Sequence, residues 1–90
     1  MLQKGSIIRV MGVFFQEPTK RHYLLEISKK AKLAHTSTKK NLLKLKKLSI
    51  IKEDLEIRGQ RKFPIYQANT QHKNYQDYKK IYQLIKQTES

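Results

Sequence analysis

Apolar residues gather in segments along this chain, and their spacing changes from one segment to the next. Seven of the nine positions from Ile7 to Phe15 are apolar, interrupted only by one arginine and one glycine. A helix that is apolar on nearly every side is buried on more than one side. We therefore predict a first helix that belongs to the core or also meets a second subunit. It should end near Phe15 or Gln16, before Pro18.

The next two predicted elements are short. Residues Arg21–Leu24 are predicted to form a brief extended segment. It is followed by apolar residues at i, i+3 and i+7, a spacing typical of a short amphipathic helix. That spacing is carried by Leu24, Ile27 and Ala31.

A third helix is predicted after the polar run His35–Ser37, with its end near Leu48. Its apolar positions lie on one face when successive residues are turned by about 100°. That face is centred on Thr38 and includes Leu42 and Leu45, so we expect it to be buried. The residues expected to point away from the core are Thr36, Lys40, Leu43, Lys44 and Lys47.

Strand periodicity replaces helical periodicity after this helix. The run Ile50–Ile57 alternates apolar and polar residues in its second half, which predicts a strand. Arg58–Lys62 contains a glycine and is predicted to be a hairpin tip, with Phe63–Ala68 as the returning strand. Because Pro64 donates no backbone hydrogen bond, we expect a bulge or another local irregularity at that position.

The last predicted element is a helix from about His72 to Gln87. Large apolar and aromatic residues recur along it at spacings of three and four, as in a seam that docks on another helix. The seam consists of Tyr75, Tyr78, Tyr82 and Ile85. It predicts either a dimer interface or packing on the first helix within the chain. Residues 1–70 are thus expected to form one domain, and residues 71–90 this C-terminal helix.

The charge of the chain indicates a polyanionic partner. Lys and Arg number 20 against 7 Asp and Glu, for a net charge of +13. This balance favours nucleic acid first, and an acidic membrane or protein second. Nine lysines lie between Glu26 and Glu53 in a stretch without acids. The stretch is either an ordinary solvated surface or a phosphate-binding one, and the lack of interspersed acids favours phosphate binding.

The second and third predicted helices follow each other directly, as in a helix-turn-helix. The later of the two is therefore a candidate for the helix that contacts DNA bases. The major groove is about 12 Å wide and admits one helix, and the N-terminal dipole favours a phosphate. Arginine suits a narrow minor groove, so the hairpin tip is either a second contact or a solvated turn. Leu43 would meet a thymine methyl or pack against a neighbouring helix. The candidate DNA-binding residues are His35, Thr36, Ser37, Lys39, Lys40, Lys44, Lys47, Arg58, Arg61 and Lys62.

Four segments together resemble a winged helix-turn-helix domain of small prokaryotic, especially archaeal, transcription regulators. In order they match the opening of the first motif helix, the start and the exit of the recognition helix, and the end of the wing: Tyr23–Ser28, Leu33–Thr38, Leu45–Ile51 and Tyr66–Asn69. The resemblance covers about residues 6–69. It implies an α+β, mainly α fold with a three-helix core, a β-hairpin wing and the C-terminal helix. By this match the recognition helix is about Thr36–Leu48 and the wing tip is Arg58–Lys62.

The chain departs from the pattern of that family at four positions. Lys32 and Ser49 stand where a glycine is usual, and Pro64 interrupts a wing strand. Ala34 stands where a capping serine is usual, so we expect His35 or Thr36 to cap the recognition helix.

The resemblance implies a sequence-specific regulator that binds double-stranded DNA as a homodimer. Two copies would place two recognition helices in successive major grooves, about 34 Å apart. The alternatives are a non-specific architectural protein, whose affinity comes from backbone contacts, and a winged-helix module that partners another protein such as a nucleotidyltransferase. A cationic interfacial helix over Lys39–Lys52 is a further alternative, but its leucines are better explained as core residues.

We expect no enzymatic activity, no cofactor and no metal. The chain has no cysteine, its three histidines form no metal-binding pair, and no glycine-rich phosphate loop is present. The one acidic cluster is expected to lie on a solvated strand face; it consists of Glu53, Asp54 and Glu56. We expect His22 to lie at a polar edge of the core. Ile7–Phe15 is too short to span a bilayer, and no secretory signal pattern opens the chain. We therefore expect a cytoplasmic, nucleoid-associated protein without membrane contact.

Overall fold

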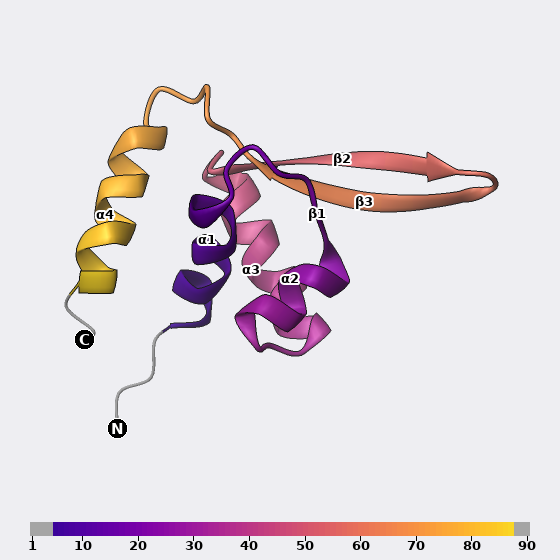
Figure 1. Cartoon of the computed structure of the whole chain (residues 1–90), viewed down its shortest axis with the longest axis horizontal. Coiled ribbons are helices and arrows are strands. Elements are labelled where there is room, and N and C mark those ends of the chain that lie inside the picture. Colours follow the sequence, from indigo (N-terminus) through magenta and orange to yellow (C-terminus); the bar gives the residue numbers. More distant parts are fainter. Residues whose placement is uncertain (1–4, 88–90) are drawn as a thin grey trace.

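Three helices and a small sheet form the body of the molecule, and a fourth helix flanks it (Figure 1). The computed structural model describes residues 5–87. The elements in chain order are α1 (Ser6–Gln16), β1 (His22–Tyr23), α2 (Leu24–Ala31), α3 (His35–Lys47), β2 (Ile51–Arg58), β3 (Arg61–Ala68) and α4 (Tyr75–Gln87). The chain therefore has the predicted α+β architecture, which is compatible with a winged helix.

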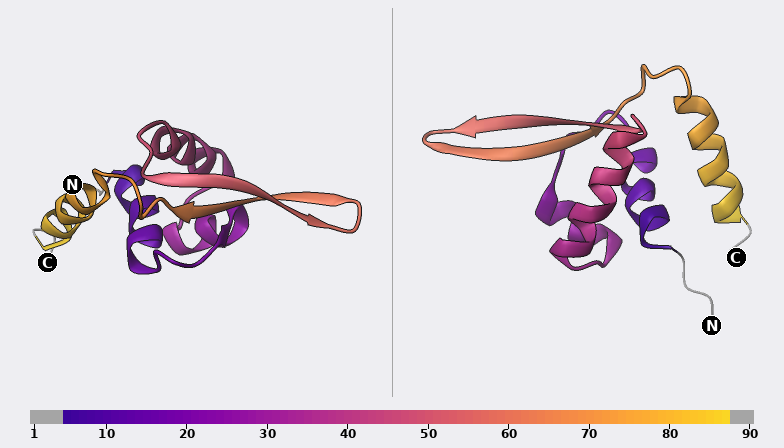
Figure 2. Two further views of the ribbon diagram at one scale, coloured as in Figure 1. Left: turned by 90° about the horizontal axis from the view of Figure 1, so that it is seen from above. Right: turned by 180° about the vertical axis from the view of Figure 1, so that it is seen from behind.

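The core lies where α1 meets α2, α3 and the base of the sheet. Val10 and Phe14 of α1, Ile27 of α2 and Leu45 of α3 have no exposed surface, and Ile51 of β2 is 2% exposed. α1 contacts α2 and α3 on one side and α4 on the other (Figure 2). This position between neighbours explains why its sequence is apolar on nearly every side.

Two non-glycine residues hold left-handed backbone conformations at the ends of helices. Lys32, the C-cap of α2, has φ 56°, and Ser49, just after α3, has φ 62°. These are the two positions where the sequence lacks the glycines of the resembled family. A left-handed residue at a helix end lets its N–H bond back to the last turn, as the Lys32 N–H does with the Ser28 and Lys29 carbonyls.

The sheet has the strand order β1-β3-β2 and is antiparallel throughout. We call the β2–β3 hairpin, Ile51–Ala68, the wing. Its turn is Gly59–Gln60, where Gly59 has φ 60°, the sign required at the first central position of a type II′ turn. The outer part of the wing projects beyond the helices (Figure 1). Leu55 and Ile57 are therefore 54% and 66% exposed.

The expected irregularity at Pro64 is wrong, because β2 and β3 pair one to one along their whole length. Pro64 lies opposite Leu55, three pairs from the Arg58–Arg61 pair that closes the turn. Hydrogen-bonded and non-hydrogen-bonded pairs alternate in an antiparallel ladder, and the Leu55–Pro64 pair is of the second kind. β2 therefore needs no backbone N–H donor at position 64. On the other side of β3, the pairing with β1 ends at Ile65, so no residue of β1 lies opposite Pro64. The proline therefore fits without a bulge.

α4 packs on α1 through aromatic rings. The Phe15 ring lies 5.6 Å from the Tyr75 ring and 5.3 Å from the Tyr82 ring, measured between centroids. Tyr82 also covers Gly12: a Cβ placed on that glycine would lie 2.5 Å from the Tyr82 hydroxyl oxygen. A side chain at position 12 would therefore have to displace the Tyr82 ring from α1.

The close approach at Gly12 predicts the effect of adding a methyl group. Gly12→Ala should lower the free energy of unfolding by about 1 kcal/mol, because overpacking costs about 1–3 kcal/mol and exceeds the gain in helix propensity. Tyr82→Phe removes the nearest atom, so the double variant should be more stable than Gly12→Ala alone. Urea unfolding measures both.

The matched control is Gly5→Ala, since a Cβ at Gly5 meets nothing within 4 Å. A Gly12→Ala protein as stable as the wild type would contradict the described α1–α4 contact.

Candidate nucleic-acid interface

The buried side of α3 determines which of its residues face outward. Thr38 and Leu45 have no exposed surface, and Leu42 is 3% exposed. The Ser28 hydroxyl donates to Thr38 Oγ1 at 3.1 Å, and the Thr38 hydroxyl donates to the Ala34 carbonyl at 2.9 Å. The predicted orientation of this helix is therefore confirmed. Thr38, a polar residue, can be buried on this face because its hydroxyl forms hydrogen bonds.

Asn41 adds a second polar link between α3 and the start of α1. Its Nδ2 donates to the Ser6 hydroxyl and to the Ser37 carbonyl, both at 2.9 Å. The side chain is 4% exposed. Sequence reasoning missed Asn41, although its position three residues after Thr38 places it on the same helical face.

The exposed side of α3 carries four lysines without an acidic partner. None of them forms an ion pair with a described residue, whereas Lys46 Nζ donates to Glu53 Oε1 at 3.1 Å. The four are Lys39, Lys40, Lys44 and Lys47. α3 contains no acidic residue at all. This face therefore presents uncompensated positive charge.

Leu43 interrupts that face. It is 53% exposed, so the expected packing against a neighbouring helix is wrong. Leu48, just beyond the helix, is 49% exposed. Isolated exposed leucines are common at protein surfaces. Leu43, however, lies among the lysines, so a molecule that binds the lysines would also contact Leu43.

The first turn of α3 has no side-chain cap among the described residues. Ala34 is the N-cap residue. The expected capping by His35 or Thr36 is wrong, because both already belong to the helix and both are exposed. Ser37 is half-buried on the same turn. The N–H groups of this turn stay open at the positive end of the helix dipole, where an anion is favoured.

The three cations of the wing tip are not equivalent. Arg58 Nε donates to Glu56 Oε1 at 3.0 Å, and Arg58 Nη2 donates to the Tyr23 hydroxyl at 2.7 Å. Arg61 and Lys62 are exposed and form no ion pair with a described residue. Arg58 therefore holds the wing, and Arg61 and Lys62 are the tip cations that remain unpaired.

Tyr23 anchors the wing to the body. Its hydroxyl donates to the Glu56 carboxylate and accepts from Arg58, whose guanidinium carbon lies 5.5 Å from the centre of the Tyr23 ring. The bond with Glu56 raises the pKa of the Tyr23 phenol and lowers the pKa of the Glu56 carboxyl. Sequence reasoning missed this anchor because Tyr23 and Glu56 are far apart in the chain and neither position has a distinctive pattern.

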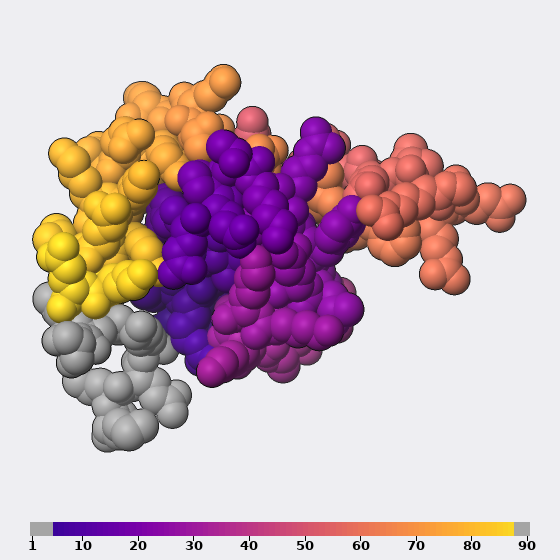
Figure 3. Space-filling view, viewed as in Figure 1, coloured from indigo at the N-terminus to yellow at the C-terminus, as the bar shows by residue number. Residues whose placement is uncertain are grey.

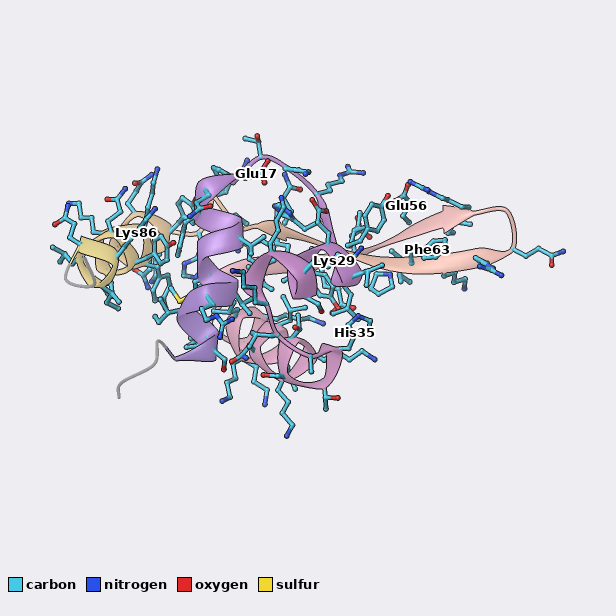
Figure 4. All side chains as sticks on the ribbon, turned by 60° about the horizontal axis from the view of Figure 1, so that its bottom comes forward. Glu17, Lys29, His35, Glu56, Phe63 and Lys86 are labelled. Atoms are coloured by element: carbon cyan, nitrogen blue, oxygen red, sulfur yellow. The ribbon has the colours of Figure 1, made fainter. Side chains whose placement is uncertain are left out.

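The start of α3 lies on the side of the body from which the wing projects. Figure 4 shows His35 on that side, and Lys86 of α4 at the opposite end of the molecule. In the space-filling view the wing stands out from the body as a narrow projection (Figure 3). The start of α3 and the wing thus lie toward one side of the body, and Lys86 of α4 lies toward the other (Figure 4).

A charged cluster joins α2 to the turn before β1. Glu26 Oε2 accepts from Lys20 Nζ at 2.7 Å and lies 3.2 Å from Lys30 Nζ. The Lys20 hydrogen bond, helped by Lys30, lowers the pKa of Glu26 to about 2. His22 is fully buried and edge-on to Phe14, and its ring nitrogens lie 3.3 Å from the Glu17 carbonyl oxygen and 3.9 Å from Glu26 Oε2, so it stands at a polar edge of the core as expected. Its burial lowers the pKa of the imidazole.

The predicted seam of α4 is divided between the core and the surface. Tyr75 and Tyr82 are 3% and 8% exposed and pack within the chain, and Tyr78 and Ile85 are half-buried. The apolar residues that α4 leaves exposed are Ile81 and Leu84, at 50% and 62%. Packing within the chain, one of the two alternatives, therefore accounts for Tyr75 and Tyr82.

Within residues 5–87 no helix is long and apolar enough to cross a membrane. The same residues contain no group of three or more acidic or histidine side chains that could hold a metal ion.

Comparisons with known proteins place the fold. No family model matches the chain, and no curated protein sequence matches it. Among solved structures, the chain is similar to a protein from Methanosarcina mazei Go1 described as a possible transcriptional regulator. The TM-score is 0.68 at 24% sequence identity, over 96% of this chain and 69% of that protein. The chain therefore shares the fold of that structure.

The Glu26 cluster predicts a pH-dependent stability. Its pKa of about 2 lies below the ordinary 4.5, so the carboxylate stabilises the fold above pH 4.5 and loses this effect as the pH falls toward 2. Glu26→Gln should lower stability at about pH 7, and its difference from the wild type should shrink below pH 4.5. Urea unfolding midpoints across this range measure the difference.

Asp77→Asn on α4 is the control, because Asp77 forms no ion pair with a described residue. A Glu26→Gln difference that stays constant with pH would show that Glu26 acts through packing and not through its charge.

Proposed function

We propose that this chain is a transcriptional regulator that binds double-stranded DNA, with α3 in the major groove and the wing on the adjacent backbone or minor groove. The observation that carries the proposal is the row of four lysines on the exposed face of α3, none paired with an acid among the described residues. An ordinary solvated surface intersperses both signs of charge. A face of one sign along a helix fits a phosphate backbone.

The dimensions of α3 suit the groove. Its 13 residues make a helix of about 20 Å, and the major groove of about 12 Å accepts one helix. The N–H groups of the first turn would meet a phosphate, and Leu43 a thymine methyl. The proposed contacts are His35, Thr36, Ser37, Lys39, Lys40, Lys44 and Lys47.

The wing would supply a second contact through Arg61 and Lys62. Arg58 has a different role in this proposal, because its guanidinium is held by Glu56 and Tyr23. It would keep the wing at a fixed angle to α3, so that both elements meet one face of the duplex. The solved structure with the same fold, described as a possible transcriptional regulator, supports the regulatory role.

A homodimer is part of the proposal, since two reading helices about 34 Å apart would match successive major grooves. The apolar residues that α4 exposes, Ile81 and Leu84, are the proposed contact between subunits. Tyr75 and Tyr82 would act indirectly, by holding α4 against α1.

The net charge of +13 also favours a second candidate function, a non-specific architectural DNA-binding protein. Such a protein binds any duplex with similar affinity, because its contacts are to the backbone. A specific regulator prefers its operator by about 10³-fold or more. Competition between DNA from upstream of the gene and scrambled DNA of the same length separates the two candidates.

The α3 face predicts the outcome of a charge reversal. Lys40→Glu combined with Lys44→Glu should weaken duplex binding by about 100-fold or more at ~0.15 M salt, because two phosphate contacts are replaced by repulsion. The affinity of the wild type should also depend more steeply on salt than that of the variant. Fluorescence anisotropy with a labelled duplex measures both.

The control reverses two exposed lysines outside α3 and away from Ile81 and Leu84, Lys73→Glu and Lys86→Glu, with the same change in net charge. If both double variants lose affinity equally, net charge and not the α3 face accounts for binding. If the α3 variant binds like the wild type, α3 does not contact the duplex.

A further inference from the structure

A groove lies between α2 and the part of the wing nearer its turn, and no residue of α3 lines it. Its volume is about 610 Å³, within the range of about 300–1,000 Å³ that is usual for small-molecule sites. α2 forms one wall, and β1 and the wing form the other. Figure 4 shows Lys29 of α2 near the point where the wing leaves the body, and Phe63 of β3 further out along the wing.

The walls of the groove are mainly apolar. Leu25 projects from α2 and is 53% exposed, on the side of the helix away from the core residue Ile27. Across the groove lie the rings of Tyr23 and Phe63. Two aromatic rings and a leucine make an apolar slot that no described residue fills.

The rim of the groove is cationic. Lys29, Lys30 and Arg58 line it together with a single carboxylate, that of Glu26. Lys30 and Arg58 are already bonded to acids, through Glu17 and Glu56. Lys29 forms no ion pair with a described residue. One unpaired ammonium at the edge of an apolar slot is complementary to a ligand with an apolar body and one negative charge.

The groove also touches the residues that hold the wing. Tyr23 and Arg58 line it and bond to each other, and Tyr23 bonds to Glu56 of β2. A ligand in the slot would therefore lie against the anchor between wing and body.

We propose that this groove is a binding site for a small aromatic carboxylate, with its ring between Leu25, Tyr23 and Phe63 and its carboxylate on Lys29. The site does not depend on DNA binding. An effect of the ligand on duplex affinity would rest on the proposed function, so the test below contains no DNA.

The probe is 2-naphthoate, with the neutral 2-naphthamide as its isostere, titrated into the full-length ¹⁵N-labelled chain. The naphthoate should bind saturably with a Kd of about 1 mM or tighter, as expected for a ligand of this size. Amide shifts should gather in residues 23–30 and 56–63, the two walls of the groove. The naphthamide should bind about two- to fivefold more weakly, the usual effect of one exposed ion pair.

Three variants test the walls and the rim. Leu25→Gln should weaken both probes about fivefold or more, because a half-exposed apolar contact is lost. Lys29→Gln should weaken the naphthoate and leave the naphthamide unchanged. Leu48→Gln, at a leucine of similar exposure (49%) outside the groove, should change neither.

Absence of saturable binding would overturn the proposal, as would shifts that map to Ile81 and Leu84 of α4. Equal affinity for the two probes would exclude an anion as the occupant. Shifts in the groove that depend on protein concentration without any probe would show that a second copy of the chain occupies it.

Discussion

The packing of one face of α3 against α1 and α2 is the contact on which the rest of the account depends. Thr38, Leu42 and Leu45 are buried there, and the Ser28–Thr38 hydrogen bond allows one turn of the face to be polar. Because a helix is rigid, burying three of its residues determines the direction of all the others. Lys39, Lys40, Lys44 and Lys47 face outward as a consequence of this packing, without an ion pair to any described residue.

The wing obeys a different constraint. Much of it projects beyond the helices (Figure 1), so hydrophobic burial holds only its base, through Ile51, Ile65, Tyr66 and Ala68. Its direction depends on the short pairing of β1 with β3 and on the bonds of Tyr23 with Glu56 and Arg58. A two-residue strand thus sets the angle of a hairpin whose two strands have eight residues each.

Features that depend on periodicity could be predicted from the sequence. The ends of α1 and α3, the burial of Thr38 and the position of the hairpin turn all follow from local spacing. Features that depend on partners distant in sequence could not. The role of Arg58 depends on Tyr23, the fit of Pro64 on the strand register, and the burial of Tyr82 on Gly12. The groove beside α2 combines residues from four elements and has no pattern in the sequence.

The central claim is that the exposed face of α3 and the wing tip form one surface for nucleic acid. Amide chemical-shift mapping with a duplex of about 20 base pairs, two helical turns, tests it most directly. The account predicts shifts at the exposed positions of α3 and at Arg61 and Lys62, with the amides of α4 on its exposed side unchanged. Shifts confined to α4, or spread evenly over every lysine-bearing surface, would contradict it.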